Sequence, residues 1–477
     1  MGRVISLDQA CERHARHYLA AAKSHRDDWQ WFDCELAQIE EAWQWLRAQK
    51  AQETFFLDFV FAFEPFQSRR GQWREVAAWG ELAIPVAQAL AAKQLEAELC
   101  NNVGLACTNL GQFDKALTFL QRAAALHHDA DNQRGESNAA SNIGTIYHRR
   151  GEARRAIEYY ERHLAISRQL QDLHGEETAL SNLALAHADL GDAQRALALY
   201  EQSLALCQAL QDRQEEAMTR NNMGLAYAHL GEVQRAMEFH EQALVIFRAT
   251  GDRRGEANAL GNLGLISYRL GDLRRAVESY EQQLLIVREI GHRHGESNAL
   301  GNLGLAYAEL GELEHAIAYN EMRLQVAEEL GDTRGRGITL NNLGNIYRQR
   351  GEVQRAIEMF EQALLIHRRN NDRRREGISL GNLGQAYFTM NDRARAIDYY
   401  QQVLAIMHEI KDRRLESLVS WQLGEAYDAL GEFQRAVELM QATVDYERAI
   451  GHQDAEKDAQ RLEEVKHKAV VAAPKAL

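Results

Sequence analysis

The sequence predicts an all-α protein built from stacked helical hairpins, and three observations lead to this prediction. The first is the scarcity of proline, since the 477 residues contain only Pro65, Pro85 and Pro474. Proline breaks helices, whereas strand-rich proteins of this size normally carry more of it in turns. The second is a repeat of forty residues that runs through most of the chain. The third is the composition, because 45% apolar and 26% charged residues allow a core to form.

Three columns of residues recur at the forty-residue spacing. The first holds asparagine, followed by an apolar residue and glycine: Asn102, Asn142, Asn222, Asn262, Asn302, Asn342 and Asn382. The second marks a tight turn: Gly111, Gly151, Gly191, Gly231, Gly271, Gly311, Gly351, Asn391 and Gly431. Asparagine is the residue that best replaces glycine in left-handed backbone, so Asn391 is consistent with a turn. The third holds alanine: Ala116, Ala156, Ala196, Ala236, Ala276, Ala316, Ala356, Ala396 and Ala436.

The first ninety residues are predicted to be an N-terminal helical cap (residues 1–50) followed by a degenerate repeat (residues 51–90). The degenerate repeat keeps Gly71 at the turn and Val76 at the alanine position. Residues 55–63 are apolar on every side of a helix, which predicts burial all round. Two interpretations stay open: this aromatic region folds over the end of the stack, or it forms a homo-oligomer or partner interface.

Residues 91–450 are predicted to be nine regular repeats, each a helix, a tight turn and a second helix. Gly264 and Ala276 are the small residues that let the two helices of one unit approach each other closely. A second break, as at Gly251 or Gly331, is usually followed by an aspartate that can cap the next helix. Residues 451–477 are predicted to be a C-terminal capping helix and tail.

The repeat region resembles the tetratricopeptide repeat (TPR) family, in the forty-residue form of the Leu-Gly-Asn-repeat adaptors and kinesin light chains. Beside the small residues, the resemblance rests on two aromatic columns: Tyr147, Tyr227, Tyr307, Tyr347, Tyr387 and Tyr427 in the first helix, and Tyr160, Tyr200, Tyr280, Phe360 and Tyr400 in the second. His240 and Asn320 depart from the second column. The resemblance implies a right-handed superhelix, an α-solenoid, whose first helices line a concave groove. Residues 14–20 and 36–46 also resemble the segment that precedes the repeat sensor of bacterial signalling ATPases.

The sequence holds no recognisable catalytic or cofactor motif. The phosphate-binding pattern GxxxxGK[ST] and the patterns HExxH and GxSxG are absent, so we expect no enzyme and no cofactor. Five cysteines at unrelated spacings predict neither disulfides nor a zinc site, and they fit a reducing cytoplasm. His127 and His128 with nearby aspartates fall at an inter-helix turn, where polar residues are expected, so no metal site is expected.

The candidate binding site is a stripe on the first helices, roughly opposite the face that packs on the second helix. An amide there can donate and accept hydrogen bonds to the backbone of a bound peptide, and leucines beside it form an apolar rib. Alternatively, the amides bond to the neighbouring repeat and set the angle between repeats. The predicted groove residues are Asn142, Asn182, Asn222, Asn262, Asn302, Asn342, Asn382, Leu225, Leu265, Leu305, Arg269 and Arg348, with Phe388 and Trp421 as aromatic anchors.

Charge and hydropathy restrict the classes of partner. The net charge of −14 is spread without a basic block, which argues against nucleic acid, and no apolar run is long enough to span a membrane. A column of arginines that enters the second helices is interpreted as a solvated face, compensated by Glu161 and its equivalents. The leading prediction is a non-catalytic scaffold that binds a peptide or helix of a partner protein in the groove. The alternative is a sensor or regulatory subunit of a bacterial signalling or defence system.

Overall fold

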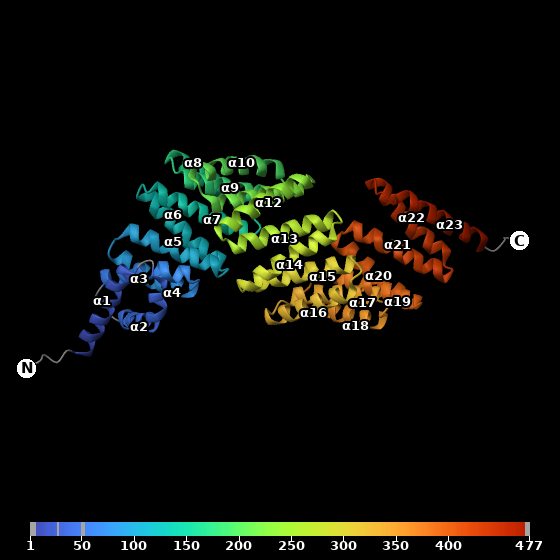
Figure 1. Ribbon diagram of the computed structural model, residues 1–477, viewed down its shortest axis with the longest axis horizontal. Coiled ribbons are helices and arrows are strands. Elements are labelled where there is room, and N and C mark those ends of the chain that lie inside the picture. The colour runs from blue at the N-terminus through green and yellow to red at the C-terminus, as the bar shows by residue number, and fades with distance from the viewer. Residues whose placement is uncertain (1–5, 26–27, 49–52, 473–477) are drawn as a thin grey trace, which may run out of the picture. The chain divides into compact units, whose positions relative to one another are not determined.

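The computed structural model of the chain describes residues 6–25, 28–48 and 53–472. These residues form 23 α-helices and no strand, which confirms the predicted all-α class (Figure 1). None of the described helices combines the length and the apolar character needed to cross a bilayer.

The helices follow the forty-residue frame. The N-terminal region holds α1 (Leu7–Ser24), α2 (Trp29–Ala48), α3 (Glu53–Arg69) and α4 (Trp73–Ala89). The first helices of the nine repeats are α5 (Lys93–Asn109), α7 (Gln133–Arg149), α9 (Leu173–Asp189), α11 (Arg213–His229), α13 (Arg253–Arg269), α15 (Arg293–Glu309), α17 (Thr333–Gln349), α19 (Arg373–Thr389) and α21 (Arg413–Leu430). Their second helices are α6 (Phe113–Asp129), α8 (Ala153–Gln169), α10 (Ala193–Leu210), α12 (Val233–Thr250), α14 (Leu273–Glu289), α16 (Leu313–Glu329), α18 (Val353–Arg369), α20 (Arg393–Ile410) and α22 (Phe433–Ile450). The last helix is α23 (Ala455–Ala472).

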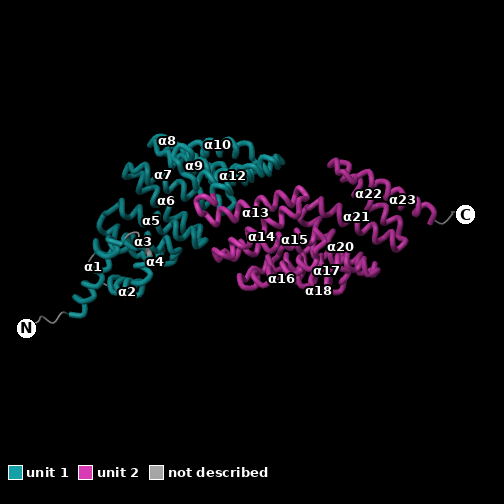
Figure 2. The backbone as a smooth tube through the Cα atoms, in the orientation of Figure 1, with its two compact units in different colours: residues 1–246 teal, residues 247–477 magenta. Residues whose placement is uncertain are grey.

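The chain divides into two compact units, residues 1–246 and residues 247–477 (Figure 2). In each unit, consecutive helical hairpins stack on one another, as an α-solenoid does. First helices of successive repeats also touch directly, as α5 and α7 do in the first unit and α13, α15, α17 and α19 do in the second. In each unit, these first helices therefore share a face, which we call the first-helix face.

The turns adopt the backbone that the sequence pattern predicts. Gly271 has φ +79° and Asn391, which replaces glycine in that column, has φ +65°. Asp252 and Asp332 cap α13 and α17, since the side chain of each accepts a hydrogen bond from the backbone N–H three residues later. His292 occupies the same position before α15 and makes no side-chain capping bond.

The close approach of the two helices in a repeat depends on a glycine and an aromatic ring. A Cβ atom added to Gly264 would lie 2.6 Å from Cε1 of Tyr280, closer than real Cβ atoms come. The same contact joins Gly384 to Tyr400. Ala276, the member of the alanine column in this repeat, is completely buried. The predicted roles of Gly264 and Ala276 are confirmed.

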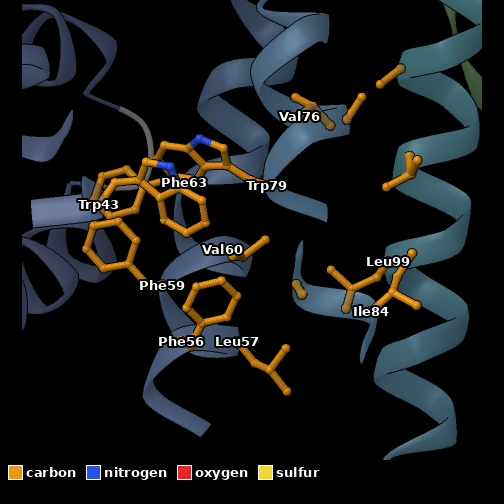
Figure 3. Packing of buried hydrophobic residues seen from close by; sticks show 14 of the residues in the cluster. Trp43, Phe56, Leu57, Phe59, Val60, Phe63, Val76, Trp79, Ile84 and Leu99 are labelled. Carbon is orange, nitrogen blue, oxygen red and sulfur yellow. The ribbon is translucent and has the colours of Figure 1, made fainter. Parts of the chain in front are cut away.

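The aromatic residues of the N-terminal region pack inside the first unit (Figure 3). The rings of Trp43 and Trp79 are stacked with centroids 4.0 Å apart, and those of Phe59 and Phe63 are 4.5 Å apart. All four side chains are buried, as Phe55 and Phe56 are. This packing supports the interpretation in which the aromatic helices fold over the end of the stack.

His127 lies in the last turn of α6, next to the predicted inter-helix turn. Its side chain is buried, and its Nδ1 atom lies 3.2 Å from Nδ2 of Asn132. The ring covers Gly135, where no other side chain fits. The described residues contain no group of three His, Cys, Asp or Glu side chains that could hold a metal ion.

Candidate functional site

The apolar rib of the predicted site lies on the surface of the first helices. Leu225 on α11 is 38% exposed, and Leu265 on α13 and Leu305 on α15 are 39% and 42% exposed. Their neighbours Leu263 and Leu303 point into the core and are buried. Leu265 and Leu305 are therefore available to a partner on the first-helix face of the second unit.

The predicted asparagines are all half-buried, but their hydrogen bonds differ. Asn142 donates from Nδ2 to Oδ1 of Asn101 in the preceding repeat at 3.0 Å, which is the structural role that the sequence left as an alternative. The side chains of Asn302 and Asn342 form no hydrogen bond to any described residue. The Nδ2 atom of Asn382 is buried and has no acceptor among the described residues. The remaining members of the column are Asn182, Asn222 and Asn262.

The two aromatic residues expected as anchors are half-buried. The guanidinium of Arg393 lies 4.0 Å from the ring centroid of Phe388, so one face of this ring is already covered. Trp421 packs against the core at the C-terminal end of the second unit. These contacts limit the surface that either ring offers to a partner.

The two predicted arginines lie at the C-terminal ends of first helices. Arg269 is exposed at the end of α13 and Arg348 is half-buried near the end of α17. Arg348 forms no ion pair with any described carboxylate. Its guanidinium lines a cavity that also contains Asn382.

This cavity has a volume of about 280 Å³ and lies on the first-helix face of the second unit. Residues of α17, α19, α20 and α21 line it: Arg348, Gly377, Ile378, Gly381, Asn382, Gln385, Val403, Met407, Leu415, Leu418, Val419 and Gln422. Val403, Met407 and Val419 are buried. Ile378 and Leu418 are 40% and 53% exposed. The cavity thus combines buried apolar residues with exposed apolar side chains.

Sequence reasoning missed a set of ion pairs with buried carboxylates that joins several second helices to the next first helix. Arg248 donates to Glu256 at 2.9 Å, and Arg288 donates to Glu296 at 2.8 Å. Both glutamates are buried. A column of glutamates eight residues after a column of arginines was the signal in the sequence that could have identified these pairs.

The arginine column of the second helices is solvated as predicted, and several of its members have partners other than the glutamates that the sequence suggested. Arg155, Arg235 and Arg395 each pair with the acidic residue three positions earlier. Their guanidinium groups also lie over tyrosine rings of the first helices, with distances from Cζ to the centroid of 5.6, 5.4 and 4.3 Å. Such contacts stabilise the hairpin, and they give the guanidinium groups of these arginines partners within the chain.

Comparison of sequences gives a family match over more than half of the chain. The family described as tetratricopeptide repeat matches residues 95–169, 175–249, 255–329 and 335–409, and a second model with the same description matches residues 381–453. No curated protein sequence matches the chain.

Two solved structures with TM-scores of 0.50 or more share the fold at low sequence identity, and a third is similar over a shorter part of the chain. A signal transduction ATPase with numerous domains (STAND protein) with a tetratricopeptide repeat sensor, from Pyrococcus horikoshii, is 15% identical with a TM-score of 0.55, over 90% of this chain and 74% of that one. The apo form of the quorum sensor NprR from B. thuringiensis is 14% identical with a TM-score of 0.50, over 72% of this chain and 99% of that one. Kinesin light chain TPR-like repeats from Podosopora anserina are 22% identical with a TM-score of 0.36, over 40% of this chain and 95% of that one.

Proposed function

The chain belongs to the tetratricopeptide repeat family, and from this premise we propose that it is a non-catalytic scaffold that binds a peptide or helix of a partner protein on its first-helix face. The observation that carries this proposal is the exposure of Leu265 and Leu305 beside half-buried asparagine side chains. Packing within the repeat does not require these leucines. An exposed apolar rib next to half-buried amides suits a peptide, which brings both apolar side chains and backbone hydrogen-bonding groups.

A second candidate is a sensor that responds to a bound peptide or protein. Two structures of similar fold are described as a repeat sensor and a quorum sensor. In this candidate, binding to the repeats changes the conformation or stability of the N-terminal helices α1–α4.

The experiment that tests the scaffold is affinity capture with the full chain, in which Leu265→Asp and Leu305→Asp are combined. Carboxylates at these positions remain solvated in the free protein but oppose an apolar partner. We expect the captured partner to be lost while the unfolding temperature stays near that of the unmodified chain.

A matched control combines Leu285→Asp and Leu365→Asp. These leucines are 69% and 53% exposed and lie on second helices. The control should retain the partner. Capture that survives in the first double variant, or is lost equally in both, contradicts binding on the first-helix face.

The sensor candidate has a separate measurement. Once a partner is identified, hydrogen exchange of α1–α4 is compared with and without it. A sensor requires altered protection in these helices, whereas a simple scaffold leaves their exchange unchanged.

A further inference from the structure

A second cavity lies in the N-terminal region between α2, α3 and α4, and we call it the α2–α4 pocket. Its volume is about 90 Å³, whereas one water molecule needs roughly 10–15 Å³. All the described residues that line it belong to the first unit, so it is separate from Leu265 and Leu305. The proposed scaffold does not use this pocket.

The inner walls of the α2–α4 pocket are aromatic and apolar. The rings of Phe63 and Trp79 meet edge to face, with centroids 6.4 Å apart (Figure 3). Ile39 and Phe66 complete these walls, and all four side chains are buried. Aromatic rings attract cations as well as apolar groups, so a ligand that combines both suits these walls.

An amide and two carboxylates supply polar groups to the pocket. Gln67 is only 5% exposed, and its side-chain amide forms no hydrogen bond to a described residue. Glu40 and Glu75 are exposed at the opening, and neither forms an ion pair with a described cation. A buried amide without a partner is costly, so a ligand that donates a hydrogen bond to Gln67 gains free energy.

The charges of the pocket select a cation. No lysine or arginine is among the described residues that line it. Arg70, whose guanidinium lies 5.9 Å from the ring centroid of Phe66, pairs with Asp33. The two carboxylates therefore make the opening negative. A calcium ion would need about six to eight oxygen ligands, and aromatic walls supply none, so an organic cation suits the pocket better.

We propose that the α2–α4 pocket binds a primary alkylammonium group. Its N–H groups donate to the amide oxygen of Gln67, its charge is balanced by Glu40 and Glu75, and its methylene stem packs against the rings. A primary ammonium fits better than a quaternary one, because only the primary group carries N–H donors for the amide. Such a group occurs in free aliphatic amines and in lysine side chains.

The test uses n-butylammonium as the probe and 1-butanol as its uncharged control, at low ionic strength. The full chain is produced with fluorinated tryptophan, and Trp79→Phe assigns the ¹⁹F resonance of Trp79, which lines the pocket. We expect n-butylammonium to shift this resonance and to leave that of Trp421, in the second unit, unchanged. The alcohol should bind at least about tenfold more weakly, because it lacks the charged hydrogen bonds.

A further probe, Nα-acetyl-L-lysine amide, distinguishes the two sources of the ligand. If it binds as well as n-butylammonium, the pocket accepts a lysine side chain together with its backbone. If it binds much more weakly, the opening admits only a free amine.

Glutamine variants with a matched control separate the pocket from other binding. Glu40→Gln combined with Glu75→Gln should weaken n-butylammonium to the level of 1-butanol and leave the alcohol unaffected. Glu41→Gln removes an exposed carboxylate of the same helix that does not line the pocket, and it should leave binding unchanged. Gln67→Met removes the buried acceptor at similar side-chain size and should weaken only the ammonium probe.

Three results would overturn the assignment: no Trp79 shift at millimolar n-butylammonium, equal binding of n-butylammonium and 1-butanol, or an equal loss of binding in Glu41→Gln and in the double glutamine variant. None of these results depends on a partner protein. The scaffold proposal therefore keeps its own test in the Leu265→Asp and Leu305→Asp variant.

Discussion

His240 shows how a single polar residue can replace an aromatic ring in the repeat. It takes the position that Tyr280 and Phe360 hold in later repeats, and its ring covers Gly224 as theirs cover Gly264 and Gly344. Nδ1 of His240 lies 2.9 Å from Oδ1 of Asn221, while Nε2 is buried and has no hydrogen-bond partner among the described residues. Burial lowers the pKa of His240 to about 4. The ring is therefore neutral in the folded chain at neutral pH.

This residue makes the stability of the first unit depend on pH. Its pKa is lower in the folded chain than the ordinary 6.5, so the unfolded chain binds the proton more tightly. The contribution of His240 to the free energy of unfolding is complete above pH 6.5 and is lost as the pH falls toward 4. At pH 4 this group has lowered the free energy of unfolding by about 3 kcal/mol.

We predict that His240→Phe removes this part of the acid sensitivity. The free energy of unfolding, measured by denaturant titration between pH 7 and pH 4, should fall less steeply in the variant, and Phe360 shows that the phenyl ring suits the position. Some pH dependence of the unfolding free energy should remain, because burial also lowers the pKa values of His163 and His367. If the unfolding free energy of the variant fell with pH as steeply as that of the unmodified chain, His240 would not contribute.

Asparagines of the first helices should differ in their effect on stability. Asn142 bridges two repeats through Asn101, so Asn142→Ala should cost about 1 kcal/mol of unfolding free energy. Asn302 has no hydrogen-bond partner among the described residues, and alanine has the higher helix propensity. Asn302→Ala should therefore leave thermal stability unchanged or slightly raised. Equal destabilisation by the two changes would argue that the whole column is structural.

At the scale of the helix, the ion pairs between repeats occur in two polarities. Arg288 and Arg368 donate to Glu296 and Glu376, each eight residues later. Between α16 and α17 the charges are exchanged, and Glu328 pairs with Arg336 at 3.6 Å. The repeat with the exchanged pair also has Thr333 where the two adjacent repeats have Arg293 and Arg373. An arginine there would face Arg336, so threonine suits the exchanged arrangement.

We predict that the exchanged arrangement of Glu328, Thr333 and Arg336 can be introduced at the equivalent positions 288, 293 and 296. Glu296→Arg alone should destabilise the second unit by about 2 kcal/mol, because it removes the carboxylate that accepts from Arg288 and Arg293 and places a third cation beside them. Combining it with Arg288→Glu and Arg293→Thr reproduces the natural exchanged set and should recover most of the loss. Thermal unfolding of the single and triple variants provides the measurement. A triple variant no more stable than the single one would contradict the pairing scheme.

The helices were predictable and the cavity was not, for a physical reason. Turn positions such as Gly271 and Asn391 are dictated by local backbone geometry, and the contact of Gly264 with the second helix follows from spacing within one hairpin. The cavity at Gly381 depends instead on how far a side chain of the second helix reaches. Gln283 fills the space that Val403 leaves open, and only coordinates reveal that difference.

At the scale of the molecule, stacked repeats need closed ends, since each hairpin buries its core only against its neighbours. In the second unit α23 packs on α22 and contributes Leu462 and Val465 to a core that contains Met440 and Val444. Asp428, at the end of α21, accepts from Lys468 at 2.7 Å and from Arg461 at 2.8 Å. Helix α23 thus closes the C-terminal end with both apolar and charged contacts.

Deleting residues 452–477 should therefore destabilise the C-terminal hairpin first. Exposure of the apolar surface that Leu462 and Val465 cover corresponds to several kcal/mol, at roughly 1.5–3 kcal/mol per buried side chain. Because the stack transmits contacts only between neighbours, hydrogen exchange should accelerate most in α21 and α22 and little in α13 and α14. Leu462→Ala should reproduce part of the effect, while Glu463→Ala on the exposed side of α23 should not. Uniform acceleration across the second unit would instead mean that its five hairpins unfold as one cooperative block.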